Sequence, residues 1–127
     1  MASSQQMRLP QILRDTIVSL VRQEGPDLTA RQLAVMMICY LDDGPHTVRG
    51  LALRLDVAKP AITRALDRLE QFDLARRQQD PRDRRSIVVA ATTPGHAFLA
   101  DLRTMLVEAA RPPQPQPEGA PEERIAS

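Results

Sequence analysis

Residues 80–85 read DPRDRR and place three arginines in a turn between two strand-like runs. The polar run 76–79 leads into this turn, and the β-branched run 86–92 leads out of it. A two-stranded ribbon with guanidinium groups at its tip suits a DNA minor groove, where the negative potential attracts arginine. A hairpin tip that contacts only solvent is the alternative interpretation. The segment directly upstream favours the DNA interpretation.

That segment, residues 47–72, predicts two helices joined by a tight turn. Apolar residues recur at helical spacing in the first helix, and Thr47 stands where an N-cap is expected. The second helix repeats apolar residues at i, i+4 and i+7 from Ile62, with a largely basic opposite side. Pro60 fits the first turn, where its missing N–H has no intrahelical partner to lose. The pattern indicates a helix-turn-helix, and the hairpin behind it makes a winged helix.

Residues 51–95 together resemble the DNA-binding half of the multiple-antibiotic-resistance regulator (MarR) family. The resemblance rests on the helix pair, the recognition-helix residues 62–64 and 67–70, the arginine-rich turn, and the exit sequence Val-x-x-Thr-x-x-Gly ending at Gly95. It implies a mainly α fold with a small β-hairpin wing (α+β), whose flanking N- and C-terminal helices form a dimer. Recognition helices would enter adjacent major grooves while the wings reach minor grooves.

The same resemblance implies what such a protein binds. We expect a transcriptional regulator, more often a repressor, which acts as a homodimer on a palindromic site in double-stranded DNA. Many members release DNA when a small lipophilic molecule binds between the dimer and DNA-binding parts, so such an effector is a possible partner. No cofactor is expected. The alternative from another class is a winged helix that docks a protein and does not bind DNA, since a fold alone does not determine function.

The expected domain covers residues 9–110, with a disordered stretch before it and a proline-rich disordered tail at 111–127. Within the domain we expect the helix-turn-helix at about 47–72, the wing at about 75–92 and a C-terminal helix at about 93–110. The chain departs from the family at Ala58, where a hydroxyl residue usually caps the recognition helix. It also lacks the further helix that family members typically carry after the C-terminal one, so we expect a shortened form. The disordered stretch before the domain is expected to be residues 1–8.

The candidate DNA-binding residues lie on the outer side of the second helix or in the turn of the hairpin. They are Lys59, Pro60, Ala61, Thr63, Arg64, Arg68, Arg82, Arg84 and Arg85. Arg84 is the first choice for the minor groove. Asp80 and Asp83 are expected to structure the wing by accepting hydrogen bonds, because phosphate would repel their carboxylates. The alternative for Arg64 and Arg68 is a surface role, paired with carboxylates of the same helix.

Helices predicted near both ends of the chain carry apolar stripes that are wider than a small winged-helix core needs. One interpretation is that these helices pack on each other within one subunit. We favour an additional two-fold interface with a second copy, because a dimer reads two half-sites about one helical turn apart. The expected interface residues are Ile12, Leu13, Ile17, Leu20, Leu99, Leu102, Met105 and Leu106.

The charge is distributed unevenly along the chain. The formal net charge is only +1, yet residues 59–85 hold eight basic and five acidic side chains. Positive charge therefore gathers where a phosphate backbone would lie. Aromatic residues are only 2% of the chain, which predicts an aliphatic core. The single cysteine excludes an internal disulfide, and with no signal peptide or membrane span in view a cytoplasmic location is expected.

No constellation of residues indicates catalysis or a metal site. The two histidines, His46 and His96, lie at no ligand spacing with Cys39 or with a carboxylate pair. The chain also contains no Gly-rich phosphate loop, no HExxH sequence and no nucleophile elbow. Cys39 falls among apolar residues of a predicted helix, so we expect an inert core thiol rather than a redox sensor.

Overall fold

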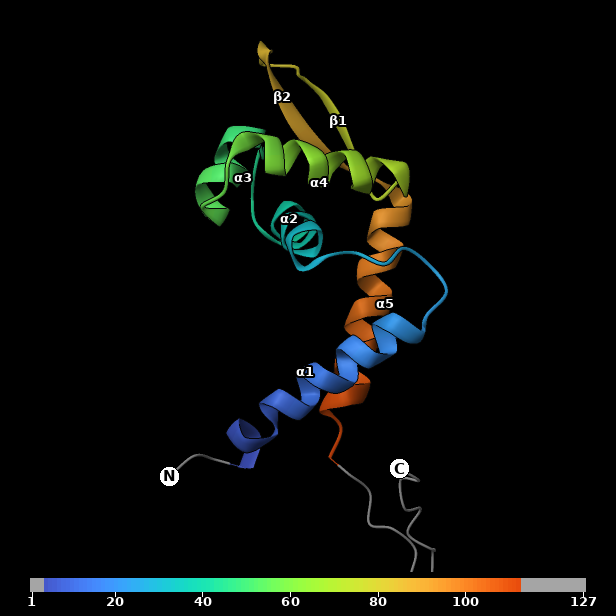
Figure 1. The fold of residues 1–127 in the computed structure, drawn as a ribbon. Helices are drawn as coiled ribbons and strands as arrows, with labels where there is room; N and C mark the ends of the chain where they lie inside the picture. The colour runs from blue at the N-terminus through green and yellow to red at the C-terminus, as the bar shows by residue number, and fades with distance from the viewer. Residues whose placement is uncertain (1–3, 113–127) are drawn as a thin grey trace, which may run out of the picture.

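Five helices and one antiparallel hairpin make up residues 4–112, the part of the chain that the computed structural model describes (Figure 1). This arrangement is a winged helix-turn-helix with helices on both sides of it in sequence, and it confirms the α+β fold class. The elements are α1 (Ser4–Arg22), α2 (Ala30–Leu41), α3 (Val48–Leu55), α4 (Lys59–Gln71), β1 (Ala75–Asp80), β2 (Asp83–Ala91) and α5 (Thr93–Ala110). None of these helices is long and apolar enough to cross a membrane.

The core lies where α2, α3 and α4 meet. Its largest fully buried side chains are aliphatic or sulfur-containing, as the low aromatic content predicts. Burial of each such side chain contributes on the order of 1.5–3 kcal/mol to folding. The apolar side of α4 supplies half of these side chains, which are Met36, Leu51, Ile62, Leu66, Leu69 and Val35.

Threonine side chains begin three of the helices. Thr29 caps α2 in a full capping box, and the hydroxyls of Thr47 and Thr92 accept N–H groups in the first turns of α3 and α5. Helix α4 is the exception, because its N-cap is Ala58 and no side chain caps it. The turn between α3 and α4 contains Asp56, whose backbone is left-handed (φ 53°). Aspartate tolerates this conformation better than most residues do.

The first helix starts earlier than the sequence predicts. We expected disorder through residue 8, whereas α1 begins at Ser4. The side chain of Arg8 gives a reason, because its guanidinium donates to the carbonyls of Ala110 (3.4 Å) and Arg111 (2.9 Å). These carbonyls lie at the C-terminal end of α5, which attracts positive charge. The C-terminal helix ends at Ala110, and the rest of the tail that we expected to be disordered, 113–127, lies outside the described residues.

Helix α1 packs along the lower part of α5, away from the winged helix (Figure 1). Its line Ile12, Thr16 and Leu20 is buried or half-buried, and the Thr16 hydroxyl donates to the Ile12 carbonyl. On α5, Leu102 is only 6% exposed within the single chain. The chain's own packing therefore already covers most of Leu102, and its expected place in a dimer interface stays a prediction.

A tyrosine hydroxyl connects three elements at the junction of the winged helix with α5. Tyr40 of α2 donates to the carbonyl of Leu74 and accepts the backbone N–H of Thr92 (3.0 Å). Gly95 leaves the space for this hydroxyl, since a Cβ there would lie 1.7 Å from the tyrosine oxygen. The junction therefore requires both the phenol and the glycine.

Replacing Tyr40 with phenylalanine removes both hydrogen bonds and leaves the Leu74 carbonyl and the Thr92 N–H without their partner. We expect Tyr40→Phe to lower the free energy of unfolding by about 1–3 kcal/mol. Urea denaturation followed by circular dichroism measures this change. An unchanged midpoint and slope would show that solvent replaces the hydroxyl without loss.

Candidate nucleic-acid interface

Helix α4 has one buried side and one exposed side. The buried residues are Ala61, Ile62, Ala65, Leu66 and Leu69. The exposed side carries the other candidate residues that the sequence analysis assigned to this helix, which are Lys59, Pro60, Thr63, Arg64 and Arg68. Ala61 was a candidate as well, and at 8% exposed it offers little surface to a partner. Its assignment to a DNA-contacting surface stays a prediction.

The turn of the hairpin is held by two aspartates. Asp80 accepts the backbone N–H of Arg82 at 2.9 Å, and Asp83 accepts the backbone N–H of Arg85 at 3.0 Å. The second carboxylate oxygen of Asp83 accepts the hydroxyl of Ser86. Short side-chain-to-backbone bonds of this kind shape turns around aspartate. Both carboxylates thus bond groups of the hairpin itself.

The strand after the turn contains a bulge that the sequence analysis did not foresee. Gln79 pairs with Ile87, but the next residue of β1, Asp80, pairs with Asp83. Residues 84–86 of β2 therefore have no partner in the ladder. The Gln79 side chain fills part of the gap by donating to the Arg84 carbonyl at 3.0 Å. Because bulges redirect side chains, Arg84 and Arg85 leave the regular alternation of the strand.

The middle of the hairpin is anchored to the start of α3. Val89 donates its N–H to the carbonyl of His46 at 2.9 Å, and Thr47 forms an isolated antiparallel bridge with Val88. The helix-turn-helix and the wing are therefore joined by backbone pairing as well as by the chain between α4 and β1. Figure 1 shows α3, α4 and the hairpin together at one end of the molecule, with α1 at the other end.

Each carboxylate in residues 59–85 has a partner within the protein. Arg77 of β1 binds both carboxylates of α4, Asp67 and Glu70, while Arg76 pairs with Asp73 at 3.3 Å. The aspartates of the hairpin turn bond backbone N–H groups, as described above. The alternative in which Arg64 or Arg68 pairs with the carboxylates of α4 is therefore wrong, because these carboxylates bind Arg77.

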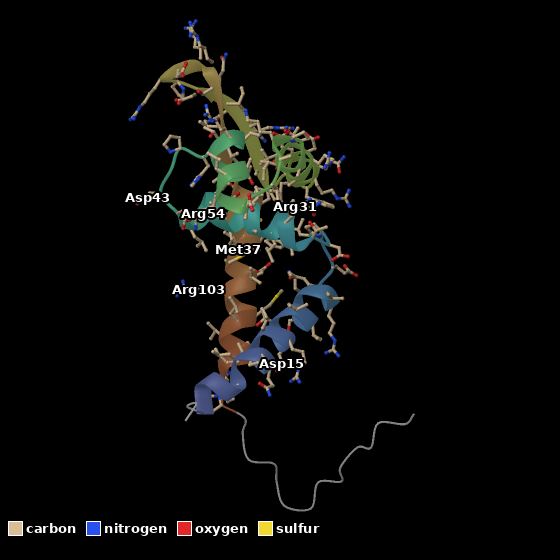
Figure 2. The ribbon with its side chains drawn as sticks, turned by 60° about the vertical axis from the view of Figure 1, so that its left-hand side comes forward. Asp15, Arg31, Met37, Asp43, Arg54 and Arg103 are labelled. Atoms are coloured by element: carbon tan, nitrogen blue, oxygen red, sulfur yellow. The ribbon has the colours of Figure 1, made fainter. Side chains whose placement is uncertain are left out.

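Most of the cations in the same segment have no carboxylate partner. Arg68 donates to Gln71 at 3.0 Å and lies over the ring of Phe72, 4.5 Å from its centroid. Within residues 4–112, no ion pair involves the other candidate cations of α4 and the turn, which are Lys59, Arg64, Arg82, Arg84 and Arg85. Figure 2 shows side-chain nitrogens at the hairpin tip, far from α1. This end of the molecule therefore carries uncompensated positive charge, which attracts a polyanion.

The contact between Arg77 and Glu70 shifts the pKa of both groups. Hydrogen bonds from the Arg77 side chain and backbone hold the pKa of the Glu70 carboxyl below its ordinary value. The bond to Glu70 likewise raises the pKa of Arg77 above its usual range. Both groups are therefore charged at neutral pH, and the network is a true ion pair.

The remaining candidates for chemistry have local partners. A ring nitrogen of His46 lies 2.8 Å from the carbonyl of Asp42, and His96 packs edge-on against Tyr40 with ring centroids 5.0 Å apart. Burial raises the pKa of the Cys39 thiol to about 11, so the thiol is protonated at neutral pH. Among the described residues, no group of three histidine, cysteine or acidic side chains could hold a metal ion.

Comparison with known proteins identifies relatives of this arrangement. The family model described as "MarR family" matches residues 28–87. An uncharacterised HTH-type transcriptional regulator, YkoM of Bacillus subtilis (strain 168), is 31% identical over 68 residues, which are 54% of this chain and 44% of the relative. The match thus spans less than half of that relative's length.

Solved structures share the fold over most of the chain. The YusO protein of Bacillus subtilis is 28% identical, with a TM-score of 0.64 over 83% of this chain and 72% of that one. A crystal structure of MarR is also 28% identical, with a TM-score of 0.58 over 84% of this chain and 78% of that one.

The lowered pKa of Glu70 makes the stability of the fold depend on pH. A carboxyl whose pKa is lower in the folded state stabilises the fold above its unfolded value, near 4.5, and loses this contribution as pH falls through the folded value. We expect Glu70→Gln to lower the free energy of unfolding by about 1 kcal/mol at pH 7. The difference from the unaltered protein should shrink steadily below about pH 4.5. Urea titrations at a series of pH values test this, and a difference independent of pH would contradict it.

Proposed function

This chain belongs to the MarR family, and we propose that it is a sequence-specific regulator of transcription that binds double-stranded DNA as a homodimer. Members of this family are transcriptional regulators rather than enzymes. One observation carries the proposal for this chain: between residues 59 and 85 the carboxylates bond groups of the protein, and the cations of α4 and the turn have no carboxylate partner. Such a surface matches the electrostatic requirements of a phosphate backbone.

In this proposal α4 is the recognition helix. Thr63 and Arg64 project from its exposed side, opposite the core residues, and are suited to base edges in the major groove. Lys59, in the first turn, is suited to a phosphate contact. Arg68 lies one turn further along, where the Phe72 ring holds its guanidinium and limits its loss of side-chain freedom on binding.

The wing would reach the minor groove with the arginines of the turn. Arg84 is the best placed of them by its position in the bulge, where its side chain leaves the alternation of the strand while its carbonyl is held by Gln79. Arg82 and Arg85 flank it, and their backbone N–H groups are held by the two aspartates. A turn backbone held by these hydrogen bonds reduces the entropy lost on insertion into a groove.

The dimer would form through α1 and the end of α5. One line of α1 packs on α5, but a neighbouring line of apolar side chains stays exposed, with Leu13 58% exposed. An apolar stripe of this length marks an interaction surface, and self-association gives two-fold symmetry. We define this dimer surface by its exposed apolar residues, which are Leu9, Leu13, Ile17, Val21, Leu106 and Val107. The half-buried Ile12, Leu20, Leu99 and Met105 would support it from beneath.

A two-fold protein would bind a palindromic site, with one half-site for each recognition helix. Occupying a promoter in this way blocks access to it, so we propose repression as the mode of control. A cavity of about 670 Å³ lies between α2 and α5 and is lined by residues that include Met37, Tyr40 and Leu99. This cavity has the size and apolar lining expected for a small lipophilic effector.

Binding to selected DNA is the direct test of the proposal. Genomic fragments retained by the purified protein should share an inverted repeat, and log Kd for that duplex should rise steeply with log salt because several phosphates are neutralised. With about six phosphate contacts the slope would be near 5. Recovery of fragments without a common repeat, or binding insensitive to salt, would contradict the proposal.

A single arginine of the wing should account for part of this affinity. We expect Arg84→Ala to weaken binding of the selected duplex by about 5- to 100-fold, because a minor-groove guanidinium contact is worth about 1–3 kcal/mol. Arg103→Ala is the matched control, since Arg103 lies on α5 far from the hairpin (Figure 2). Equal affinities of the two variants, measured by fluorescence anisotropy, would remove the wing from the interface.

The assembly is tested separately from DNA binding. Leu13→Glu introduces a charge in the dimer surface, and we expect the variant to sediment as a monomer at concentrations where the unaltered protein is a dimer. Leu53→Glu is the control, because Leu53 is also exposed to solvent (76%, against 58% for Leu13) but belongs to α3. If the unaltered protein sediments as a monomer, or if Leu13→Glu remains a dimer, α1 is not the interface.

A further inference from the structure

Two adjacent arginines of β1 have opposite surroundings. The side chain of Arg76 is 69% exposed and meets only Asp73, whereas the side chain of Arg77 is 26% exposed and faces α4. The alternation of side chains along a strand explains why neighbours differ in this way. Arg77 was not among the candidate DNA-binding residues, and its position keeps its guanidinium away from the outer surface.

Arg77 makes a dense set of hydrogen bonds with the recognition helix. Its backbone N–H donates to Glu70 Oε1 at 2.6 Å, and its Nε donates to the same oxygen at 3.0 Å. One terminal nitrogen of its guanidinium reaches Glu70 Oε2 at 3.1 Å and also bonds Asp67. The two carboxylates stand three residues apart on α4, so they are neighbours on the helix surface. A planar guanidinium that binds one carboxylate bidentately and a second at its edge holds a defined orientation.

This network is the outermost polar side-chain link between the hairpin and the helices. Beyond Arg77 the side-chain hydrogen bonds of the hairpin in the described structure all stay within the hairpin, as those of Gln79, Asp80 and Asp83 do. The backbone pairing with the segment before α3 lies at the same level of the hairpin, because Val89 and Val88 are the ladder partners of Arg77 and Gln78. That pairing ties β2 to the start of α3, whereas the side chain of Arg77 ties β1 to α4.

We propose that Arg77 is a positioning residue that locks the wing against the recognition helix, so that the two parts meet one DNA duplex in a single register. The inference rests on the proposed function and adds to it a residue that does not contact DNA. A wing free to swing would lose entropy on binding, because a rigid arrangement reduces the cost of ordering. The lowered pKa of Glu70 agrees with a strong contact.

If the carboxylates of the network act on DNA binding only through their charge, removing them should strengthen binding; if they position Arg77, removing them should weaken it. The double variant Asp67→Ala/Glu70→Ala removes two negative charges next to the DNA-binding surface, so electrostatics alone predicts tighter binding. Positioning predicts weaker binding, because Arg77 loses its partners. We expect the double variant to bind the selected duplex at least about fivefold more weakly at physiological salt. Unchanged or tighter binding would overturn the inference.

A double-mutant cycle between Arg77 and Arg84 tests the mechanism. We expect Arg77→Ala to weaken binding of the selected duplex about tenfold in the unaltered protein. In a protein that already carries Arg84→Ala, the same substitution should weaken binding less than about twofold further. The reason is that a wing without its minor-groove contact gains nothing from correct placement. Arg76→Ala removes the same charge from the adjacent position and should weaken binding less than about threefold. Additive effects of Arg77→Ala and Arg84→Ala, or equal effects at positions 76 and 77, would overturn the inference.

The same experiment includes controls for the folding of each variant and for the proposed function of the unaltered protein. Circular dichroism at the assay temperature establishes that each variant is folded, and Arg77→Lys, which keeps the charge but not the bidentate geometry, replaces Arg77→Ala if the latter unfolds. Arg77→Lys should then bind about threefold or more weakly than the unaltered protein, and equal affinity would overturn the inference. Failure of the unaltered protein to bind any duplex overturns the proposed function and this inference together. Binding by the unaltered protein with no loss in the Arg77 variants overturns this inference alone.

Discussion

The burial of one side of α4 is the constraint on which the rest of the structure depends. Ile62, Leu66 and Leu69 are fully buried against α2 and α3, and this packing determines which way the helix faces. Because the apolar side of α4 is covered, Thr63 and Arg64 on its other side are exposed to solvent. The same packing places the end of α4 beside the start of β1, where the Leu74 N–H donates to the Leu69 carbonyl. The hydrophobic core thus orients the recognition helix and directs the hairpin that follows it.

The positive charge of this surface depends on which charged side chains have partners within the fold, and not on the net charge of the chain. A chain with a formal net charge of only +1 presents a cationic end because its carboxylates there are engaged within the fold. Asp67 and Glu70 hold Arg77, while Asp80 and Asp83 hold backbone N–H groups of the turn. Acidic residues in this segment therefore stabilise the shape of the surface, and the cations of α4 and the turn have no carboxylate partner.

Helix α5 contacts the winged helix at its N-terminal end and α1 further along. At the junction of the winged helix with α5, the Tyr40 hydroxyl joins α2 to Leu74, just before β1, and to Thr92, the N-cap of α5. At the other end, α1 buries one line of residues on α5 and leaves the next line, with Leu13 and Ile17, exposed. A second copy that covers this line would therefore act on the winged helix through α5.

Local patterns in the sequence were sufficient for the fold class, the helix-turn-helix, the hairpin and the Thr47 cap of α3, because helical periodicity, capping and turn chemistry act over a few residues. Local patterns did not reveal that Ala61 and Leu102 are buried in the single chain, nor that α1 extends back to Ser4. Nor did they reveal that Arg77, rather than Arg64 or Arg68, binds the carboxylates of α4. These features depend on contacts between residues far apart in the sequence or on the register of two strands. Only the packing of the elements on one another decides such contacts, since each side chain has several possible partners until its neighbours are in place.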